Sequence, residues 1–393
     1  MPTVIDLFAG AGGLSQSLEA SGWVSVAAVE IDRDAVETLR LNQSRGSLRR
    51  ARLLHADIRE VQRDDVRPPG APPDWRPDLL AGGPPCQPFS SAGRLLGLAD
   101  PRGRLFLEFV RLADSLKPRF ILFENVAGLV TARSPDGKVG GVLARVQKEF
   151  EQIGYACRFE LINAADFGAA QRRVRLYMVA SCEEKIPEFP RPTHSRDGSL
   201  PYAGWESLGG LLRSMPAPEQ RDIVRPNSRR AVELAALAPG TGLRAGGIVE
   251  ANRPSGHWGY RQDCFVADLK LPSRTIRAAS TPDWLPLPDG MRRLTWRECA
   301  ALQGFPAEWQ FAGNAVSRFR QIGNAVQGDV GRALGLALRR AARVVRPAEP
   351  VSVEWPRTFH KRMRYTAMEE TVNGAHRRAA QQGTDATIAA AVD

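Results

Sequence analysis

The sequence has no long apolar run and no paired cysteines. Its 393 residues are 43% hydrophobic, yet no stretch of about 18 consecutive apolar residues occurs, so we expect no transmembrane segment. The first residues reach Asp6 without a basic flank before an apolar run, so we expect no secretory signal. The five cysteines are scattered, without a CxxC spacing, at positions 86, 157, 182, 264 and 299. This usage indicates a reducing cytoplasm and no structural metal site.

Lysine is also scarce, because only six of the 54 basic residues are lysine and the rest are arginine. The formal net charge is +11 at pH 7, and a strongly basic chain suits a polyanionic partner such as nucleic acid. A GC-rich genome also produces arginine-rich proteins. The charge alone therefore leaves the nature of the partner open.

One stretch combines a buried strand, a rigid turn and a single cysteine. The mostly apolar segment Asp78–Ala81 leads into Gly82-Gly83-Pro84-Pro85-Cys86-Gln87-Pro88-Phe89-Ser90. Glycine and proline at a strand end mark a sharp turn, and α/β folds bind ligands at the carboxyl ends of parallel strands. Cys86 is therefore either a nucleophile at a strand tip or a small core residue, which is the usual role of a lone cysteine.

The N-terminal stretch has the pattern of a strand, a glycine turn and a helix. Thr3–Phe8 is a short apolar run, Ala9–Gly13 contains three glycines, and a helical pattern from Leu14 closes at Gly22. Glycine lets a backbone approach a ligand closely, and a helix N-terminus offers free N–H groups. Because the spacing is not GxGxxG, it disfavours a pyrophosphate and favours an adenosine-containing ligand without one.

Two further predicted strands end in acidic residues. Val24–Val29 runs into Glu30, at the distance from the glycine turn where an acid usually binds ribose hydroxyls. Leu53–Ile58 contains Asp57, which would either accept from an adenine amino group or cap a turn. Glu30 has the alternative of capping the helix that starts near Asp34, but its occurrence together with the glycine turn favours the ribose interpretation.

A second acid follows another apolar strand. Phe120–Phe123 ends in Glu124-Asn125-Val126, and a buried glutamate is costly without a partner or a task. The alternative is a glutamate at the sheet rim, facing water; the neighbouring cysteine-bearing strand favours a functional role. Between the two strands, Ser90–Gly103 is small, polar and rich in glycine, which is typical of a mobile lid.

Paired arginines follow in the next part of the chain. The sequence predicts strands over Arg158–Asn163 and Val174–Ala180, and strand alternation would place Gln171, Arg173 and Arg175 on one side. Two arginines on one face suit a phosphate or a base edge. A solvated basic strand is the alternative.

The rest of the chain divides into helical stretches and a part rich in glycine and proline. We expect a loop over Val61–Arg76 and helices over Leu105–Leu116, Val139–Ile153 and the stretch from about Val326 to Val345. From residue 182 to 290 glycine and proline are frequent and periodicity is poor. Within this part, Arg253–Gln262 mixes the aromatic, basic and amide side chains that stack on bases and bind base edges. Thr295 and Glu298 have the spacing of a capping box at the start of a helix.

In their order along the chain, six stretches resemble the motifs of the DNA (cytosine-5) methyltransferase family, over roughly residues 3–340. They are Asp6–Gly13, Gly83–Ser90, Glu124–Val126, Gln171–Arg175, Arg297–Ala300 and Gln321–Val326. The resemblance implies an α/β fold of the S-adenosylmethionine-dependent methyltransferase type. This fold is Rossmann-like, with a mostly parallel seven-stranded sheet and an inserted small, loop-rich target-recognition domain.

The resemblance also implies a division of the chain into domains. Residues 1–182 and 291–345 would form the catalytic and cofactor-binding domain, and residues 183–290 the target-recognition domain, with DNA in the cleft between them. Residues 346–393 would be a C-terminal extension, which we expect to be partly disordered.

By resemblance, the enzyme transfers a methyl group from S-adenosylmethionine to C5 of a flipped-out cytosine in a specific double-stranded DNA sequence, through a covalent Cys86–C6 adduct. The implied catalytic residues are Cys86, Glu124, Arg173 and Arg175. The implied cofactor-binding residues are Phe8, Gly10, Gly12, Leu14, Glu30, Ile31, Asp57, Ile58, Pro84, Leu105, Asn324 and Val326. The expected DNA-binding residues are Gln87, Ser90, Arg94, Gln171, Arg253, His257, Tyr260, Arg261, Gln262, Arg274 and Thr275.

Two positions depart from the family pattern, since Ile31 replaces a common aromatic residue and Gln327 a common proline. We expect a monomer without a membrane partner, and the resemblance allows a cognate restriction endonuclease as a functional partner and a nucleoid location. Two other functions stay open: methylation of RNA of the tRNA type, and DNA binding without catalysis. The tRNA function is disfavoured because Cys264-Phe265-Val266 in the recognition region departs from the Cys-Phe-Thr of the tRNA-acting branch. DNA binding without catalysis is disfavoured because Cys86, Glu124 and Arg175 are all present.

Overall fold

The structure is a computed structural model that describes residues 1–85, 105–134, 137–183, 185–244, 249–251, 260–278 and 281–343. For residues 244, 249–251 and 260–263 it describes the backbone alone. The predicted lid after Cys86 and the predicted C-terminal extension lie outside the described residues. Within the described part, no helix is long and apolar enough to cross a membrane.

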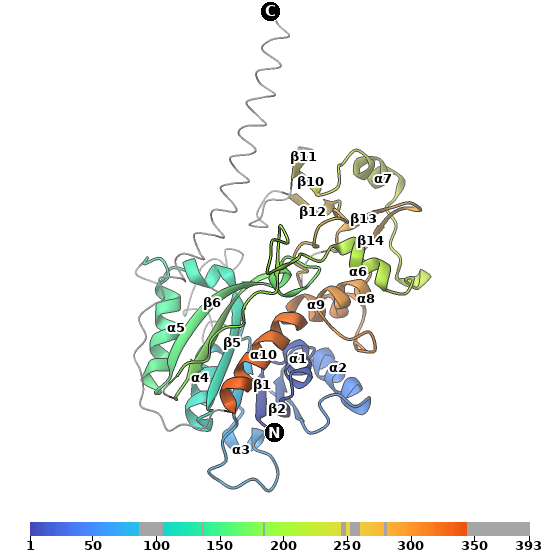
Figure 1. Cartoon of the computed structure of the whole chain (residues 1–393). Helices are drawn as coiled ribbons and strands as arrows, with labels where there is room; N and C mark the ends of the chain where they lie inside the picture. The colour runs from blue at the N-terminus through green and yellow to red at the C-terminus, as the bar shows by residue number, and fades with distance from the viewer. Residues whose placement is uncertain are drawn as a thin grey trace, which may run out of the picture.

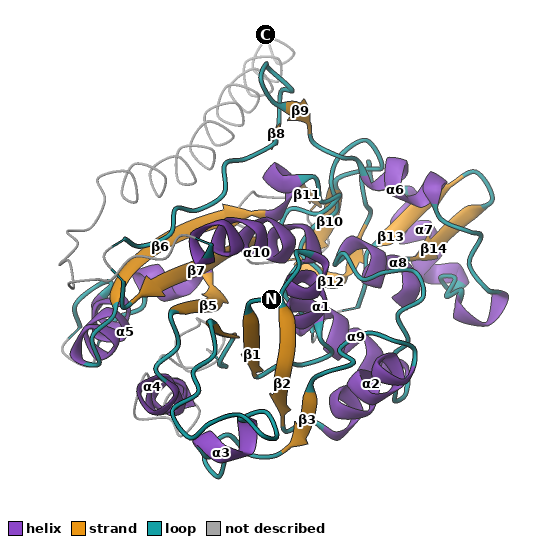
Figure 2. Cartoon of the chain, turned by 60° about the horizontal axis from the view of Figure 1, so that its bottom comes forward, coloured by secondary structure: helices purple, strands orange, loops and turns teal. Residues whose placement is uncertain are grey.

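A seven-stranded, mostly parallel sheet forms the centre of the molecule (Figures 1 and 2). Its strand order is β3-β2-β1-β4-β5-β7-β6. The first five strands pair in parallel, and β7 pairs antiparallel with both β5 and β6. The strands span Thr3–Leu7 (β1), Val24–Glu30 (β2), Arg52–His55 (β3), Leu79–Gly82 (β4), Phe120–Val126 (β5), Ala156–Asn163 (β6) and Val174–Ser181 (β7). The prediction of a mostly parallel seven-stranded α/β sheet is confirmed.

Helices cover both faces of this sheet, as the apolar strand sequences require. Figure 2 shows α1 and α10 on one side, while α4 and α5 pack on the other. Alternate residues of β5 belong to the two cores: Phe120 and Leu122 pack with α1 and α10, Ile121 and Phe123 with α4 and α5. The helices are α1 (Gly13–Ala20), α2 (Arg33–Ser44), α3 (Arg63–Val66), α4 (Leu105–Leu116), α5 (Gly141–Gln152), α6 (Leu208–Ser214), α7 (Ser228–Ala235), α8 (Trp296–Leu302), α9 (Ala315–Asn324) and α10 (Gly328–Ala342). Short 3₁₀ helices are η3 (Ala127–Thr131), η4 (Ala164–Phe167) and η5 (Gln220–Asp222).

The part of the chain rich in glycine and proline forms short strands beside the sheet. Figure 1 shows β10, β11, β12, β13, β14 and α7 together at the end of the molecule away from α3. The strands are β8 (His194–Ser195), β9 (Ala203–Gly204), β10 (Thr241–Arg244), β11 (Val249–Ala251), β12 (Tyr260–Phe265), β13 (Trp284–Leu287) and β14 (Gly290–Arg293). A small core of Leu234, Leu237, Val266 and Trp284 lies there. A larger core continues from Leu208 and Leu285 into α8, so the two regions share packed apolar surface.

Several predicted boundaries change in the structure. β3 ends at His55, not Ile58, because its partner β2 ends at Glu30, which pairs with His55. β5 extends through Glu124 to Val126, because β7 pairs with its whole length. The predicted loop over Val61–Arg76 contains α3, whose capping box joins Gln62 and Asp65.

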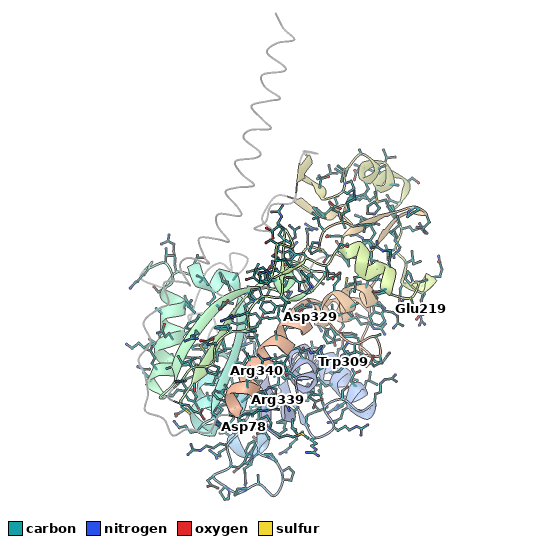
Figure 3. All side chains as sticks on the ribbon, viewed as in Figure 1. Asp78, Glu219, Trp309, Asp329, Arg339 and Arg340 are labelled. Atoms are coloured by element: carbon teal, nitrogen blue, oxygen red, sulfur yellow. The ribbon has the colours of Figure 1, made fainter. Side chains whose placement is uncertain are left out.

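Polar side chains fix the start of α8 and the start of the sheet. The capping box of Thr295 and Glu298 at the start of α8 is confirmed. At the start of the sheet, the Asp78 carboxylate accepts from the backbone amide of Thr3 at 2.8 Å and from its hydroxyl at 3.2 Å. Figure 3 places Asp78 near the lower end of α10. These contacts tie the beginnings of β1 and β4 together.

We expect Phe150→Ala to lower the free energy of unfolding by about 3–5 kcal/mol, because a large buried ring leaves a cavity when removed. The Phe150 ring is fully buried and packs edge-on against Phe106, Phe109 and Phe123, with centroids 5.8–6.4 Å apart. Urea denaturation followed by circular dichroism measures the change. Val232→Ala at an exposed position of α7 is the control and should change stability by less than about 0.5 kcal/mol; equal effects would contradict this view of the core.

Candidate active site

A cavity of about 550 Å³ opens at the carboxyl ends of β1, β2, β4 and β5. This is the edge where an α/β sheet binds ligands. One wall comes from the turn after β1, the end of β2 and the turn after β3, and the other from β5, β7 and the end of α9. The lining residues include Phe8, Gly10, Leu14, Glu30, Ile31, Asp57, Ile58, Pro84, Leu105, Glu124, Asn125, Arg175, Asn324 and Val326.

The turn after β1 is bent sharply against the cavity. Phe8 has φ +60° and Gly10 φ +54°, and the first value is strained for a residue with a side chain. The Gly10 amide donates to the Glu30 carboxylate at 2.7 Å. Apart from its chain neighbours, no atom of the described residues lies within 4 Å of where a Gly10 Cβ would be, so the backbone there faces the cavity.

The end of β2 presents both a polar and an apolar group. Besides the Gly10 amide, the Glu30 carboxylate accepts from the amides of Ile31 at 2.9 Å and Asp32 at 2.8 Å. Asp32, not Glu30, caps α2 by accepting from the Ala35 amide. The Ile31 side chain lines the cavity and is 60% exposed. An apolar group beside a fixed carboxylate suits a nucleoside, with its flat base and its ribose hydroxyls.

Asp57 lies in the turn after β3, where it also lines the cavity. Its carboxylate pairs with Arg59, and this hydrogen-bonded ion pair lowers the pKa of Asp57 to about 2. Asp57 is therefore a hydrogen-bond acceptor at any ordinary pH.

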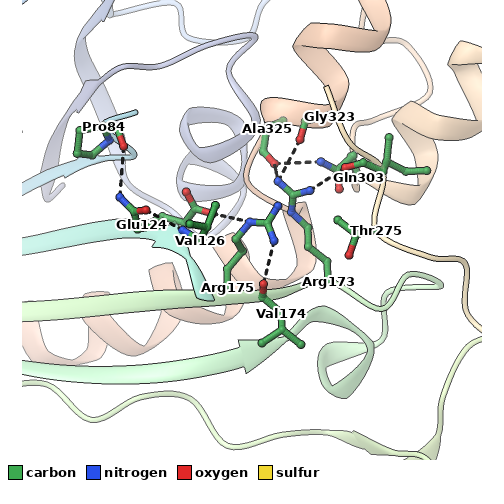
Figure 4. Close-up of polar contacts among 12 residues, drawn as sticks. Pro84, Glu124, Val126, Arg173, Val174, Arg175, Thr275, Gln303, Gly323 and Ala325 are labelled. Atoms are coloured by element: carbon green, nitrogen blue, oxygen red, sulfur yellow. Dashed lines mark hydrogen bonds and ion pairs between the residues drawn. The ribbon is translucent and has the colours of Figure 1, made fainter. Parts of the chain in front are cut away.

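Glu124 and Arg175 form the opposite wall (Figure 4). The Arg175 Nε lies 3.3 Å from the Glu124 carboxylate, and both side chains are more than four-fifths buried. The antiparallel pairing of β5 and β7 brings them together, since Val126 pairs with Arg175 and Glu124 with Tyr177. Burial raises the pKa of Glu124, while the charges of Arg175 and Arg173 oppose that rise.

The turn that leads towards Cys86 is held against Glu124. The Asn125 side-chain amide donates to the Pro84 carbonyl at 3.3 Å. A Cβ on Gly83 would lie 3.0 Å from a Glu124 carboxylate oxygen, so only glycine fits there without displacing the carboxylate. Cys86, Gln87, Ser90 and Arg94 themselves lie outside the described residues.

Comparison with known proteins identifies the family. The family model for C-5 cytosine-specific DNA methylase matches residues 2–340. The chain belongs to the C-5 cytosine-specific DNA methylases. It is thus a DNA cytosine-5 methyltransferase, and S-adenosylmethionine is its methyl donor.

Two bacterial relatives illustrate the similarity. Type II methyltransferase M.NgoMIV of Neisseria gonorrhoeae is 32% identical over 340 residues, covering 86% of this chain and 97% of the relative. Type II methyltransferase M.Sau96I of Staphylococcus aureus is 31% identical over 345 residues, covering 85% and 75%.

Solved structures share the fold. The Entamoeba histolytica methyltransferase EhMeth aligns with a TM-score of 0.62 at 15% identity, covering 88% of this chain and 99% of that one. The S. pombe Dnmt2 methyltransferase aligns with a TM-score of 0.60 at 19% identity, covering 88% and 100%.

The structure of this cytosine-5 methyltransferase places most of the predicted cofactor residues at the cavity. All of them line it except Gly12. A Cβ on Gly12 would lie 2.8 Å from the Leu39 side chain and 3.0 Å from that of Trp309. Gly12 therefore serves the close packing behind the turn instead of facing the cavity.

Gln171 and Arg173 form hydrogen bonds with other parts of the protein. Gln171 is fully buried; its amide donates to the Leu302 carbonyl and to Gln303, and its oxygen accepts from the Ile276 amide at 3.0 Å. The buried Arg173 guanidinium donates to the carbonyls of Ile276, Gly323 and Ala325 at 2.9–3.1 Å (Figure 4).

These contacts correct one expectation from the sequence, because the fully buried Gln171 has no surface to offer to DNA. Arg173 does line the cavity, and its catalytic role stays a prediction. Strand alternation misplaced Gln171 because β7 begins only at Val174. Residues 171–173 lie in the preceding turn, where the alternation does not apply.

The other predicted DNA contacts divide into two groups. Arg274 forms an ion pair with Asp283 and stacks on the Phe265 ring at 3.6 Å, and the Thr275 hydroxyl donates to the Arg172 carbonyl at 2.7 Å. Both side chains are thus engaged within the chain. Tyr260, Arg261 and Gln262 belong to β12, whose backbone alone is described there, and Arg253 and His257 lie outside the described residues.

Asp6 is a cavity residue that the sequence did not single out. It is 2% exposed, and the Ser15 hydroxyl donates to its carboxylate. Burial raises the pKa of Asp6 to about 7. Its position as the one acid inside the apolar β1 run is the signal that could have identified it.

We expect the free energy of unfolding to fall as pH rises from about 4 to about 7, because folded Asp6 keeps a proton that the unfolded chain has lost. Asp6→Asn removes this titration and should reduce the fall by up to about 4 kcal/mol. Urea denaturation at closely spaced pH values measures it. Asp114→Asn, on the exposed face of α4, is the control; an unchanged pH profile in Asp6→Asn would contradict the shifted pKa.

Proposed function

We propose that this methyltransferase acts on one flipped-out cytosine within a specific double-stranded DNA sequence, through a covalent bond from the Cys86 sulfur to cytosine C6. One observation carries the proposal: a single cavity is lined both by the predicted cofactor residues and by the Glu124–Arg175 pair, with the turn towards Cys86 at its wall. The methyl donor and the target base would therefore meet in one cavity.

The covalent step follows from the electronic structure of cytosine. C5 is a poor nucleophile in the aromatic ring. When the Cys86 thiolate forms a bond to C6, the C5–C6 π electrons move towards C5 and the ring becomes an enamine. The bound cofactor would supply the electrophilic methyl group to C5, with its sulfonium–methyl bond breaking to leave a neutral thioether. A base then removes the C5 proton, the electrons re-form the C5–C6 double bond, and the thiolate leaves.

Glu124 is suited to assist this addition from the N3 edge. Its raised pKa lets it hold a proton that it can share with N3 as negative charge develops in the ring. Because it is buried, this hydrogen bond acts in a medium that screens charge weakly. Arg175, fixed by the Val174 carbonyl at 2.8 Å, would donate to the cytosine O2.

Cofactor binding is assigned to the opposite wall. Glu30 would accept from the ribose hydroxyls, Ile31 and Ile58 would contact the adenine faces, and Asp57 would accept from the adenine amino group. The turn from Phe8 to Gly10 and the end of α9 at Asn324 would hold the amino-acid end. The exposed Ile31 side chain and the acceptor groups beside it fit such a ligand.

The wider setting is proposed at a coarser level. We assign residues 1–182 and 291–345 to catalysis and cofactor binding, and residues 183–290 to target recognition. Within the latter, Arg253, His257, Tyr260, Arg261 and Gln262 are proposed to contact bases. The relatives are Type II methyltransferases, which supports a cognate restriction endonuclease as functional partner. We also propose that the protein is a monomer and that it works at the nucleoid.

We expect wild-type protein to form a covalent complex with duplex DNA that contains 5-fluorocytosine, in the presence of S-adenosylmethionine. Fluorine cannot leave C5 as a cation, so the elimination that frees Cys86 is blocked and the adduct accumulates. Denaturing gel electrophoresis with labelled DNA of mixed sequence detects it. Mass spectrometry then locates the modified peptide.

Cys86→Ala should abolish the complex, whereas Cys182→Ala, which removes an exposed cysteine, should retain it. Trapping by Cys86→Ala at the wild-type level would refute the nucleophile. A tRNA substrate that traps the enzyme while DNA does not would refute the DNA assignment.

The reaction should slow on the alkaline side as Glu124 loses its proton. Arg175→Met removes a positive charge that favours ionised Glu124, so the pKa of Glu124 should rise further. We therefore expect the alkaline limb of the pH–rate profile to move to higher pH, on top of a lower rate. The profile of kcat/KM for DNA measures this. Arg145→Met on the outer face of α5 is the control, and an alkaline limb that moves to lower pH would contradict the assignment.

A further inference from the structure

An ion pair joins two distant parts of the chain at the rim of the cavity. The Arg320 Nη2 on α9 lies 2.7 Å from the Asp32 carboxylate, which precedes α2. Both residues line the cavity. Their side chains are 48% and 35% exposed, so the pair lies at the mouth and not in the core.

Asp32 is linked to the turn that forms the adenosine wall. Its carboxylate accepts a hydrogen bond from the Arg320 guanidinium, and it caps α2 by accepting another from the Ala35 amide. Its own amide donates to the Glu30 carboxylate, which is held in turn by the Gly10 amide. A continuous series of polar contacts thus runs from α9, through Asp32 and Glu30, to the glycine turn after β1.

Ile31 lies in the middle of this series. Its amide donates to the Glu30 carboxylate at 2.9 Å, and its carbonyl oxygen lies 3.0 Å from the His55 Nε2. Ile31 is 60% exposed, with Glu30 on one side and Asp32 on the other. Its side chain can present a fixed apolar face only if the backbone at Glu30–Asp32 is itself fixed. Arg320 is the group that ties this backbone to α9, and α9 ends at the cavity residue Asn324.

We propose that Arg320 is a positioning residue for the cofactor: through Asp32 it fixes the Glu30–Asp32 turn and so prepares the adenosine wall for binding. The proposal rests on the cofactor site assigned above. Fixing a turn before binding reduces the entropy that binding must remove, so it increases affinity without acting on the methyl transfer itself. Exposed ion pairs are individually weak, and we therefore expect an effect of about two- to fivefold on cofactor affinity.

The test is calorimetric titration with S-adenosylhomocysteine without DNA. This ligand has no net charge near neutral pH, so salt acts mainly on the protein pair. Arg320→Met should raise Kd by about two- to fivefold. Asp32→Asn keeps a capping side chain but loses the charge, and should have a similar effect. The double variant should be no weaker than either single one, since the two changes remove one interaction.

The salt dependence of Kd and the separate values of KM and kcat distinguish a positioning role from a loss of folding. Raising the salt from about 0.05 to about 0.5 M should weaken wild-type binding towards the level of Arg320→Met and leave the variant almost unchanged. In methyl-transfer assays the KM for S-adenosylmethionine should rise while kcat at saturating cofactor stays near wild type. Arg320→Lys, which keeps the charge, should recover most of the affinity.

A matched control is available elsewhere on the surface. Arg225 and Asp289 form an exposed ion pair with the same kind of geometry, at 2.8 Å, and neither lines the cavity. Arg225→Met should bind S-adenosylhomocysteine as wild type does. Wild-type Kd and KM in Arg320→Met would overturn the positioning role, and so would an Arg225→Met effect of the same size. Failure of the wild-type protein to bind S-adenosylhomocysteine would instead overturn the cofactor site itself.

Discussion

The Arg173 guanidinium is the group on which the arrangement of the site depends. It is buried, yet it donates to three carbonyls that come from two separate segments, at Ile276 and at Gly323 and Ala325. Moving a charge out of water costs several kcal/mol, and several good hydrogen bonds are needed to offset that cost. The Ile276 amide, in turn, donates to the Gln171 side-chain oxygen. A Cβ on Gly323 would lie 2.3 Å from the Ala278 amide nitrogen, so this close approach also requires glycine.

This buried contact relates three functional parts of the molecule. Two residues beyond Arg173, Arg175 extends from β7 to Glu124. The carbonyls of Gly323 and Ala325 flank Asn324 at the cavity, and Ile276 belongs to the segment between β12 and β13 in the region of short strands. The wall proposed to bind the base, the wall proposed to bind the cofactor and the region assigned to recognition therefore share one set of hydrogen bonds. A displacement of any of them would leave buried polar groups without partners, which is costly.

The two walls of the cavity differ in chemistry. On the side of β1 and β2, backbone amides and carboxylates surround an apolar side chain, which suits an uncharged nucleoside. On the side of β5 and β7, a buried acid is balanced by an arginine, which suits a base whose ring must accept negative charge for a short time. The carboxyl ends of the parallel strands bring both surfaces to one edge of the sheet, and the antiparallel neighbour of β5, β7, adds Arg175.

The sequence by itself determined the apolar strands, the glycine and proline turns, the capping box of α8 and the order of motifs, because these depend on neighbouring residues. Only the tertiary structure decided which side chains face the cavity. Gln171 turns inward because β7 begins after it, and Asp32 rather than Glu30 caps α2 because the Glu30 carboxylate is bound by nearby amides. Arg320, on α9, pairs at the cavity with Asp32, which lies 288 positions earlier in the chain. Such contacts depend on how elements pack, and local patterns contain no information about that packing.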